Sequence, residues 1–352
     1  MTGTEILLEV NDLRVYFPLR QRIVRAVDGA SFVVKRRKTL GIVGESGCGK
    51  SVTAQAILRI VPPPGKITGG QIILHRGTKQ VGASLVNEIV DLTRLDPMGR
   101  EMRAIRGSEI SMIFQEPMAS LSPVYTVGSQ ITEVVLLHRK VRRNEAKDLV
   151  IEMLARVGFY EPRRRFDAYP HELSGGMRQR AVIAMALMCH PSLLIADEPT
   201  TALDVTTEAQ ILRLMRKLQN ELGMAIMFIT HDLGVVAKMA DEVAVMYLGR
   251  VVESASVDSA FYDPRHPYLR ALLNSVPRFG HSREQRLTPI QGMVPDPLNV
   301  LPGCPFHPRC PEVMLGLCDV EVPVYAELDD PGHCVACHLY SKNRTSSRRS
   351  AK

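Results

Sequence analysis

Residues 44–51 read Gly44-Glu45-Ser46-Gly47-Cys48-Gly49-Lys50-Ser51. The stretch matches the pattern G-x-x-x-x-G-K-[ST], and the apolar run 40–43 before it predicts a strand while 50–60 after it predicts a helix. In such a loop, backbone N–H groups turn inward around phosphate oxygens, and the helix N-terminus adds a partial positive charge. Lys50 can place a point charge on the outer phosphates, and the Ser51 hydroxyl can bind Mg²⁺. We therefore predict that residues 44–52, up to Val52, bind a nucleotide. We interpret Cys48 as a small residue that fits the loop rather than as a redox sensor.

A second motif places two carboxylates at the end of an apolar run, Leu193-Leu194-Ile195-Ala196-Asp197-Glu198. Ligands of open α/β sheets bind at the carboxyl ends of the strands. Asp197 is then expected to hold Mg²⁺ through its water shell, and Glu198 to polarise an attacking water. By itself the pattern also fits a strand that ends in a solvated acidic turn. Beside a phosphate loop, the catalytic interpretation is favoured.

The order of apolar segments predicts the fold class. Apolar runs of buried-strand length at 193–196, 225–230 and 243–247 alternate with helical patterns at 206–222 and 233–240. Such alternation favours an α/β fold with a mostly parallel sheet covered on both faces. Short strand patterns without helices between them indicate a small antiparallel subdomain, and they lie at residues 6–10, 31–34, 71–75 and 88–92. Residues 126–189 are mostly helical in pattern.

Composition narrows the protein class. Of the 352 residues, 45% are hydrophobic and 23% are charged, which is typical of globular proteins. No stretch approaches the roughly 20 apolar residues of a membrane-spanning helix, and residues 1–10 lack the pattern of a secretory signal. Any membrane association is therefore expected to go through a partner. The net charge of +7 is read as a solvated basic surface, with no nucleic-acid partner predicted. The polar, basic tail 341–352 is expected to be disordered.

A third motif narrows the family. The stretch Leu173-Ser174-Gly175-Gly176-Met177-Arg178-Gln179-Arg180 resembles the signature motif L-S-G-G-Q-x-Q-R of ABC ATPases, with Met177 at the usual glutamine. Chemically it is a second anion site, because a serine hydroxyl and two glycine N–H groups stand at a helix N-terminus. The chain already has one phosphate loop. Ser174, Gly175 and Gly176 are therefore expected to bind the ATP of a second ATPase subunit, either an identical chain or a paralogous one.

The resemblance extends over residues 5–255, where further motifs follow in the same order as in the family and imply further roles. Gln115 resembles the Q-loop glutamine that contacts Mg²⁺ and senses the membrane partner, Asp204 the D-loop aspartate, and His231 the switch histidine at the γ-phosphate. The family also stacks an aromatic ring on adenine. Tyr16 and Phe17 can serve, but strand alternation places them on opposite faces, and we favour Phe17. The resemblance implies a RecA-like core, an antiparallel β subdomain and a helical subdomain at about 116–190.

The C-terminal residues resemble the extension of the oligopeptide/dipeptide importer ATPases. The resemblance rests on Gly303-Cys304, Arg309-Cys310, Cys318 and Cys337-His338, and on the stretch Phe261-Tyr262-Asp263-Pro264-Arg265-His266-Pro267-Tyr268. It implies a small Cys-rich domain at 256–340 and import of peptides or similar solutes. Two integral membrane permease subunits and an extracytoplasmic solute-binding protein are the implied partners, and the cytoplasmic face of the inner membrane is the implied location. Importers of nickel, glutathione and oligosaccharides share this extension and remain alternatives.

The clustered cysteines predict a metal group. Disulfides are unusual in cytosolic chains, so a local set of thiols favours metal binding. Four thiolates are what a 4Fe–4S cluster requires, and the expected ligands are Cys304, Cys310, Cys318 and Cys337. The family resemblance selects Cys337 over Cys334, because the family's last cysteine precedes a histidine. Zinc, or free thiols packing a small domain, are the alternatives that the spacing leaves open.

Two other functions compete with a transporter ATPase. Soluble ABC ATPases of DNA repair or ribosomes usually have two ATPase halves or a long coiled-coil insertion, and neither pattern occurs in this sequence. A non-hydrolysing binding module is disfavoured by the presence of Lys50, Asp197, Glu198 and His231. We therefore expect an ATPase in which Lys50, Gln115, Glu198 and His231 support catalysis.

Overall fold

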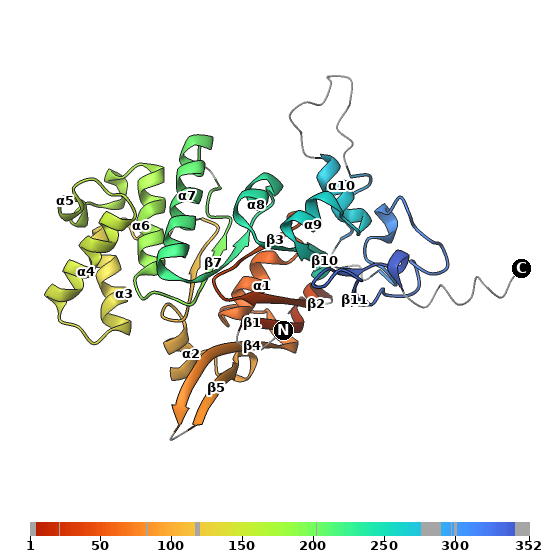
Figure 1. Ribbon diagram of the computed structural model, residues 1–352, viewed down its shortest axis with the longest axis horizontal. Helices are drawn as coiled ribbons and strands as arrows, with labels where there is room; N and C mark the ends of the chain where they lie inside the picture. Colours follow the sequence, from red (N-terminus) through yellow and green to blue (C-terminus); the bar gives the residue numbers. More distant parts are fainter. Residues whose placement is uncertain are drawn as a thin grey trace, which may run out of the picture.

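The computed structural model describes residues 5–20, 22–81, 84–116, 120–201, 203–275, 290–296, 298 and 301–341. Figure 1 shows a central sheet with helices on both sides, a helical region at one end and the C-terminal segment at the other. The predicted tail 341–352 lies outside the described residues except for Ser341. In the described part of the chain, no helix is long and apolar enough to cross a membrane.

The central sheet has the strand order β11-β12-β10-β9-β3-β8-β7-β6. The neighbours from β9 to β6 pair in parallel, whereas β10, β12 and β11 add antiparallel strands at one edge. Strands β3, β7 and β8 are buried along their whole length, which explains their continuous apolar runs. The strands are β3 Thr39–Val43, β6 Ile110–Ile113, β7 Leu193–Asp197, β8 Ala225–Ile229, β9 Glu242–Tyr247, β10 Arg250–Ser256, β11 Tyr325–Glu327 and β12 Cys334–Ala336.

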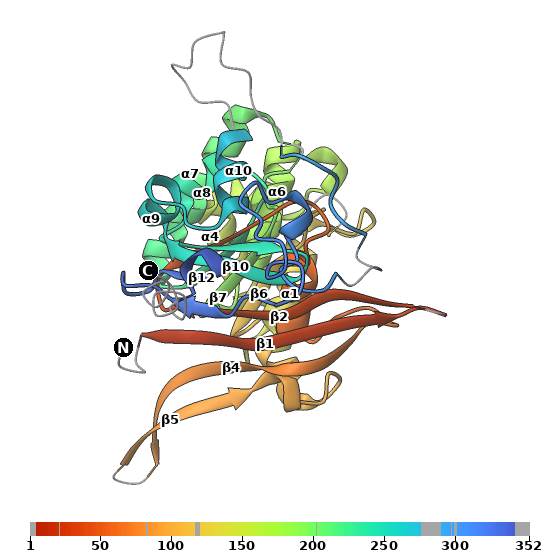
Figure 2. The same cartoon turned by 90° about the vertical axis from the view of Figure 1, so that its right-hand side faces the viewer.

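The predicted antiparallel subdomain is a second sheet of order β2-β1-β4-β5. Its strands are β1 Ile6–Pro18, β2 Ile23–Lys35, β4 Lys66–Val81 and β5 Ser84–Asp91. Figure 2 shows this sheet lying beneath the central one. The strands run further than the short apolar patterns predict, because their exposed faces carry polar residues that the apolar pattern does not count.

The helices cover the sheet as the alternation predicts. Helix α1 Lys50–Ile57 follows β3, α7 Val205–Leu222 follows β7, and α8 Leu233–Met239 follows β8. The helical stretch 126–189 comprises α3 Val127–His138, α4 Arg143–Arg156, α5 Pro162–Phe166 and α6 Gly175–Leu187, while the short α2 Arg100–Ile105 precedes β6. One hydrophobic cluster joins this region to α7 and to one face of β7 and β8, so its helices are anchored to the core.

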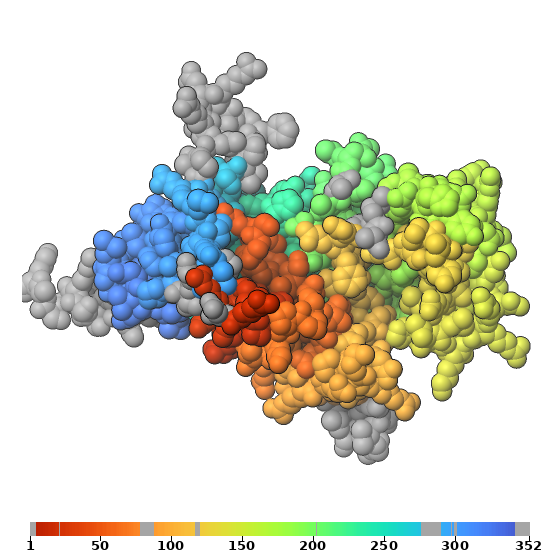
Figure 3. Space-filling view, turned by 180° about the vertical axis from the view of Figure 1, so that it is seen from behind, coloured from red at the N-terminus to blue at the C-terminus, as the bar shows by residue number. Residues whose placement is uncertain are grey.

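The C-terminal segment extends the central sheet. After β10 come α9 Val257–Tyr262 and α10 Pro267–Ser275, and β12 then pairs with β10 through Glu253 opposite Val335. The predicted boundary near residue 255 thus falls where β10 ends, although later residues return to the same sheet. Figure 3 shows this segment, in blue, covering the end of the molecule beside the N-terminal strands in red. The division into 1–255 and 256–340 stays a prediction.

Candidate active site

The phosphate loop connects the buried strand β3 to helix α1. All three of its glycines have backbone angles that favour glycine, with φ 156° at Gly44, 79° at Gly47 and 100° at Gly49. Gly44 and Gly49 also lie close to neighbouring backbone. A Cβ atom on either would lie 2.2 Å from a backbone carbonyl oxygen, that of Met246 or of Ala26. No other residue type fits so close an approach, which explains why the pattern requires glycine at both positions.

Lys50 lies inside the loop, with 6% of its surface exposed. Its ammonium group donates to the carbonyl oxygens of Gly44 at 2.8 Å and Glu45 at 3.0 Å. Cys48 is buried beside it, and burial raises the pKa of the Cys48 thiol. A thiol whose pKa is raised is a poor nucleophile, so this supports a packing role for Cys48.

Asp197 and Ser51 meet at the carboxyl end of β7. Asp197 is 2% exposed, and burial raises the pKa of its carboxyl group even though a hydrogen bond with Ser51 and the charge of Lys50 act to lower it. Its Oδ1 atom has no hydrogen-bond partner among the described residues. A buried oxygen without a partner costs free energy, and it is the ligand type that Mg²⁺ prefers. Asp197 and Ser51 therefore fit the predicted magnesium site.

Glu198 brings three predicted residues together. Its carboxylate accepts from Gln115 Nε2 at 3.3 Å and lies 3.1 Å from His231 Nδ1. Burial acts to raise the pKa of Glu198, but hydrogen bonds with His231, Thr201 and Gln115 outweigh it, and the pKa lies below its ordinary value. The group is therefore held as a carboxylate, which can accept a proton from water. Its backbone has φ 47°, an uncommon value for a residue with a side chain.

Sequence reasoning missed Thr201. Its hydroxyl donates to Glu198 Oε2 at 3.0 Å, so it helps to orient the carboxylate. The signal was its position three residues after Glu198, where a turn brings the side chain back.

The second anion site and the D-loop aspartate stand at neighbouring helix N-termini. Ser174 caps α6 by accepting from the N–H of Met177 at 3.4 Å, and Asp204 caps α7 by accepting from the N–H of Thr207 at 2.9 Å. A Cβ atom on Gly176 would lie 2.7 Å from Thr207 Cγ2, so the two termini touch. In Figure 1, α6 and α1 lie on opposite sides of α7. The geometry therefore separates Ser174–Gly176 from the chain's own phosphate loop.

The two aromatic candidates for the adenine position, Tyr16 and Phe17, lie in different surroundings. The Phe17 ring packs inward, where a Cβ atom on Gly65 would lie 2.5 Å from it. Tyr16 instead donates to Asp28 Oδ1 at 2.5 Å, and Asp28 and Gly47 both line a cavity of about 120 Å³. Tyr16 is thus linked to the side of the strand that adjoins the phosphate loop. The pairing of β1 with β2 is irregular between Val15 and Tyr16. Which of the two rings stacks on adenine stays a prediction, and the sequence favours Phe17.

Comparison with known proteins gives the family. The family model described as "ABC transporter" matches residues 27–201, and the model described as "Oligopeptide/dipeptide transporter, C-terminal region" matches residues 252–318. A probable peptide ABC transporter ATP-binding protein of Sinorhizobium fredii is 52% identical over 95% of both chains. The chain belongs to the ABC transporter family. The dipeptide transport ATP-binding protein DppD of Bacillus subtilis is also similar, at 48% identity over 95% of both chains.

Solved structures agree on the ABC cassette fold. The dimeric post-hydrolysis state of the ATP-binding cassette MJ0796, bound to ADP and Pi, aligns with a TM-score of 0.59 and 25% identity, covering 71% of this chain and 99% of that chain. CbiO1 of Clostridium perfringens, part of the ABC transporter complex cbiONQ, aligns with a TM-score of 0.58 and 28% identity, covering 74% of this chain and 92% of that chain. The protein is therefore an ABC ATPase with parallel and antiparallel sheets.

The four cysteines predicted as iron–sulfur ligands are electrostatic neighbours in this ABC ATPase. Burial raises the pKa of Cys310 to about 11 and that of Cys337 to about 12, and in both cases the nearby Cys304 and Cys318 add to the rise. The neighbours of Cys334 are instead Glu327, Ser254 and Tyr325. Within the described ranges, however, no three or more His, Cys, Asp or Glu side chains are arranged as a metal site. The predicted 4Fe–4S cluster and Cys-rich domain are thus not confirmed.

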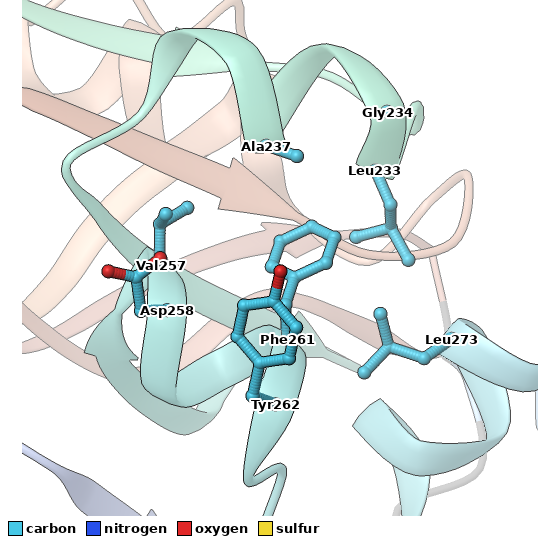
Figure 4. A pocket seen from close by; sticks show the side chains of 8 residues that line it. All are labelled: Leu233, Gly234, Ala237, Val257, Asp258, Phe261, Tyr262 and Leu273. Carbon is cyan, nitrogen blue, oxygen red and sulfur yellow. The ribbon is translucent and has the colours of Figure 1, made fainter.

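A separate apolar cavity of about 400 Å³ lies where α8, α9 and α10 meet. Figure 4 shows Phe261 and Tyr262 facing Leu233 and Leu273 around it. It contains none of the predicted nucleotide residues. Because its lining has no cationic side chain, it does not suit a phosphate group.

Proposed function

We propose that this ABC ATPase subunit drives import of peptides, either oligopeptides or dipeptides. The observation that carries the proposal is the match of residues 252–318 to the C-terminal region of oligopeptide/dipeptide transporters. Relatives aligned over 92% or more of this chain are named for peptide, dipeptide or oligopeptide transport, which supports the same substrate class. Nickel, glutathione and oligosaccharide import remain alternatives, since cargo is chosen by other subunits.

In the proposed mechanism, two subunits close head to tail around two ATP molecules. Each ATP lies between Lys50 in the loop of one chain and Ser174 at the N-terminus of α6 in the other, identical or paralogous. The separation of these two elements within one chain supports this arrangement. The bound Mg²⁺, held by Ser51, Asp197 and Gln115, would supply positive charge to the β- and γ-phosphates.

Hydrolysis then depends on Glu198 and His231. The oxygen of a water attacks the γ-phosphorus, its proton passes to the Glu198 carboxylate, and the bond to the bridging oxygen breaks to release ADP. His231 has 64% of its side chain exposed, so it can reach a phosphate while its Nδ1 stays beside Glu198. Asp204 lies at the N-terminus of α7, beside the N-terminus of α6 where Ser174 lies. We propose that Asp204 contacts the partner subunit there.

The surface near Gln115 suits the membrane subunits. Phe114, Val124 and Tyr125 are 44%, 70% and 62% exposed, and we propose that these apolar side chains form part of the docking surface. Residues 117–119 of this surface lie outside the described residues. Movement of Gln115 with nucleotide binding would reach the permeases here. We place the subunit at the cytoplasmic face of the inner membrane, with a solute-binding protein outside and no nucleic-acid partner.

The proposal is tested with the assembled complex. The subunit should co-purify with two integral membrane subunits, and a peptide-loaded binding protein should stimulate phosphate release in proteoliposomes. If nickel, glutathione or an oligosaccharide stimulated phosphate release and peptides did not, the transported solute would be that alternative. Failure to purify with any membrane subunit would contradict the transport role.

We further propose Tyr16 as the adenine platform. Tyr16→Ala should weaken ATP binding by about 1–3 kcal/mol, the range known for stacking of an aromatic ring on a base. Tyr16→Phe should bind ATP nearly as well as wild type, because the ring is kept. Titration of the purified chain with Mg-ATP measures both. Weaker ATP binding in Phe17→Ala at unchanged stability, with normal binding in Tyr16→Ala, would show that Phe17 stacks on adenine.

We also propose that Cys304, Cys310, Cys318 and Cys337 hold a 4Fe–4S cluster with a structural role. Their mutual electrostatic influence supports the set, and the different surroundings of Cys334 support its exclusion. Anaerobically purified protein should contain about four irons and four acid-labile sulfides per chain. Cys337→Ser should lose iron, whereas the matched variant Cys334→Ser should keep it. One zinc per chain without sulfide would replace the cluster by a zinc site.

A further inference from the structure

The C-terminal segment contacts the phosphate loop through Glu45. Arg309 Nη1 donates to Glu45 Oε2 at 2.7 Å, and its Nη2 donates to Oε1 at 3.0 Å. The backbone N–H of Glu45 donates to the hydroxyl of Tyr268 at 2.9 Å. The carbonyl oxygen of Glu45 accepts from Lys50 Nζ at 3.0 Å. Glu45 therefore links the C-terminal segment to the lysine that is proposed to bind the phosphates.

Arg309 is held rigidly for this contact. Its side chain is 3% exposed, and its Nε donates to the carbonyl oxygen of Gln291 at 3.1 Å. Nη1 also lies 3.4 Å from the hydroxyl of Tyr247, the last residue of β9. A planar guanidinium that meets a carboxylate with two parallel hydrogen bonds fixes orientation as well as charge.

The turn that presents Arg309 packs on an aromatic cluster. Phe306 is fully buried and lies 5.2 Å from Tyr247 and 5.3 Å from Tyr268, measured between ring centroids. The N–H of His307 donates to the carbonyl of Cys304 at 3.0 Å, and the N–H of Cys310 to that of His307 at 3.3 Å. Arg309 and Tyr268 thus reach Glu45 from one packed unit.

From this geometry we infer that Arg309 and Tyr268 are positioning residues for ATP binding, which act through Glu45. The inference rests on the proposed nucleotide role of the loop. Arg309 fixes the backbone whose N–H groups must converge on the phosphates, and it balances the charge of a carboxylate in the loop itself. Without Arg309, the Glu45 carboxylate, only 25% exposed, would stay beside the anionic phosphates without the guanidinium that pairs with it, so its repulsion of the phosphates would increase. The C-terminal segment thereby sets the affinity of the loop for ATP.

Arg309→Gln in the full chain should raise the Kd for Mg-ATP about tenfold, near the lower end of what hydrogen bonds to charged groups contribute. The KM for ATP should rise by a similar factor, whereas kcat at saturating ATP should change much less. Tyr268→Phe keeps the ring and removes only the hydroxyl, so a smaller rise of about threefold is expected. Calorimetric titration and phosphate release measure these values.

The matched control is Arg270→Gln. It breaks the ion pair between Arg270 and Glu312 at 2.8 Å, within the C-terminal segment and away from the loop, and it should leave the Kd unchanged. The double variant Glu45→Gln with Arg309→Gln should bind ATP better than Arg309→Gln alone, because the unbalanced charge is gone. The inference would be overturned if Arg270→Gln and Arg309→Gln raised the Kd for Mg-ATP equally. It would also be overturned if the double variant changed the free energy of ATP binding by the sum of the two single changes.

Two further outcomes separate this inference from the proposed function. If Lys50→Ala still binds ATP normally, the loop assignment itself fails. If Lys50→Ala loses ATP while Arg309→Gln and Tyr268→Phe bind it as wild type does, only the positioning role fails. Should Arg309→Gln not fold, as judged by its melting temperature, Tyr268→Phe and Glu45→Gln decide the question.

Discussion

Glu198→Gln should lower ATP hydrolysis by about 10²–10⁴-fold, the range that general-base catalysis supplies, and should leave ATP binding intact. The amide keeps the size of the carboxylate and can still contact Thr201 and His231, but it cannot take a proton from water. The pKa of Glu198 is lowered by its hydrogen bonds, so the wild-type group is already deprotonated at neutral pH. Hydrolysis in the wild type should fall only when the pH drops through that lowered pKa.

The measurement for Glu198→Gln combines phosphate release with size-exclusion chromatography in Mg-ATP. The variant should accumulate a closed pair that retains ATP. Glu152→Gln is the matched control, because Glu152 pairs with Arg156 on the surface of α4, and it should hydrolyse ATP normally. Turnover by Glu198→Gln within about threefold of wild type would remove Glu198 from the role of base.

Lys50→Ala should weaken ATP binding by about 10- to 100-fold, because hydrogen bonds to charged groups contribute about 1.5–3 kcal/mol. The change removes the cation that faces the outer phosphates and also its two hydrogen bonds to the loop carbonyls. Lys50→Arg should rescue little, because the lysine is 6% exposed and the broader guanidinium does not fit its space.

Direct titration with ATP measures the loss in Lys50→Ala. Lys217→Ala is the matched control, since Lys217 is 63% exposed on α7 and pairs only with a neighbouring glutamate in the described part of the chain. It should bind ATP as wild type does. An affinity of Lys50→Ala within a factor of about two of wild type would contradict the assignment of the phosphate loop.

The sequence was most informative where chemistry restricts the residue type. Buried strands precede the loop glycines and the histidine after β8, and β7 ends at the carboxylate pair. All of them could therefore be predicted to lie at the carboxyl ends of the parallel strands. The structure adds that Gln115 and His231 both reach the carboxylate of Glu198. Thr201 was missed because a lone threonine after a motif has many ordinary explanations.

Other features could not be predicted because they depend on contacts between distant residues. The different surroundings of Tyr16 and Phe17 accompany an irregularity in the pairing of β1 with β2, which strand alternation does not reveal. The pairing of β12 with β10 joins residues on either side of a long proline-containing stretch. The contact of Arg309 with Glu45 joins residues 264 positions apart, and the sequence around either residue does not indicate that the two are in contact.

That separation has a consequence for synthesis of the chain. A ribosome adds about 5–20 residues per second, so Glu45 emerges tens of seconds before Arg309 exists. During that time the nascent chain has a phosphate loop whose acidic residue has not yet met its cation. Strand β10 likewise waits for β12 before its second edge is covered. Full affinity for nucleotide would then be acquired only when the C-terminal segment has folded, so unfinished chains would be poor consumers of ATP.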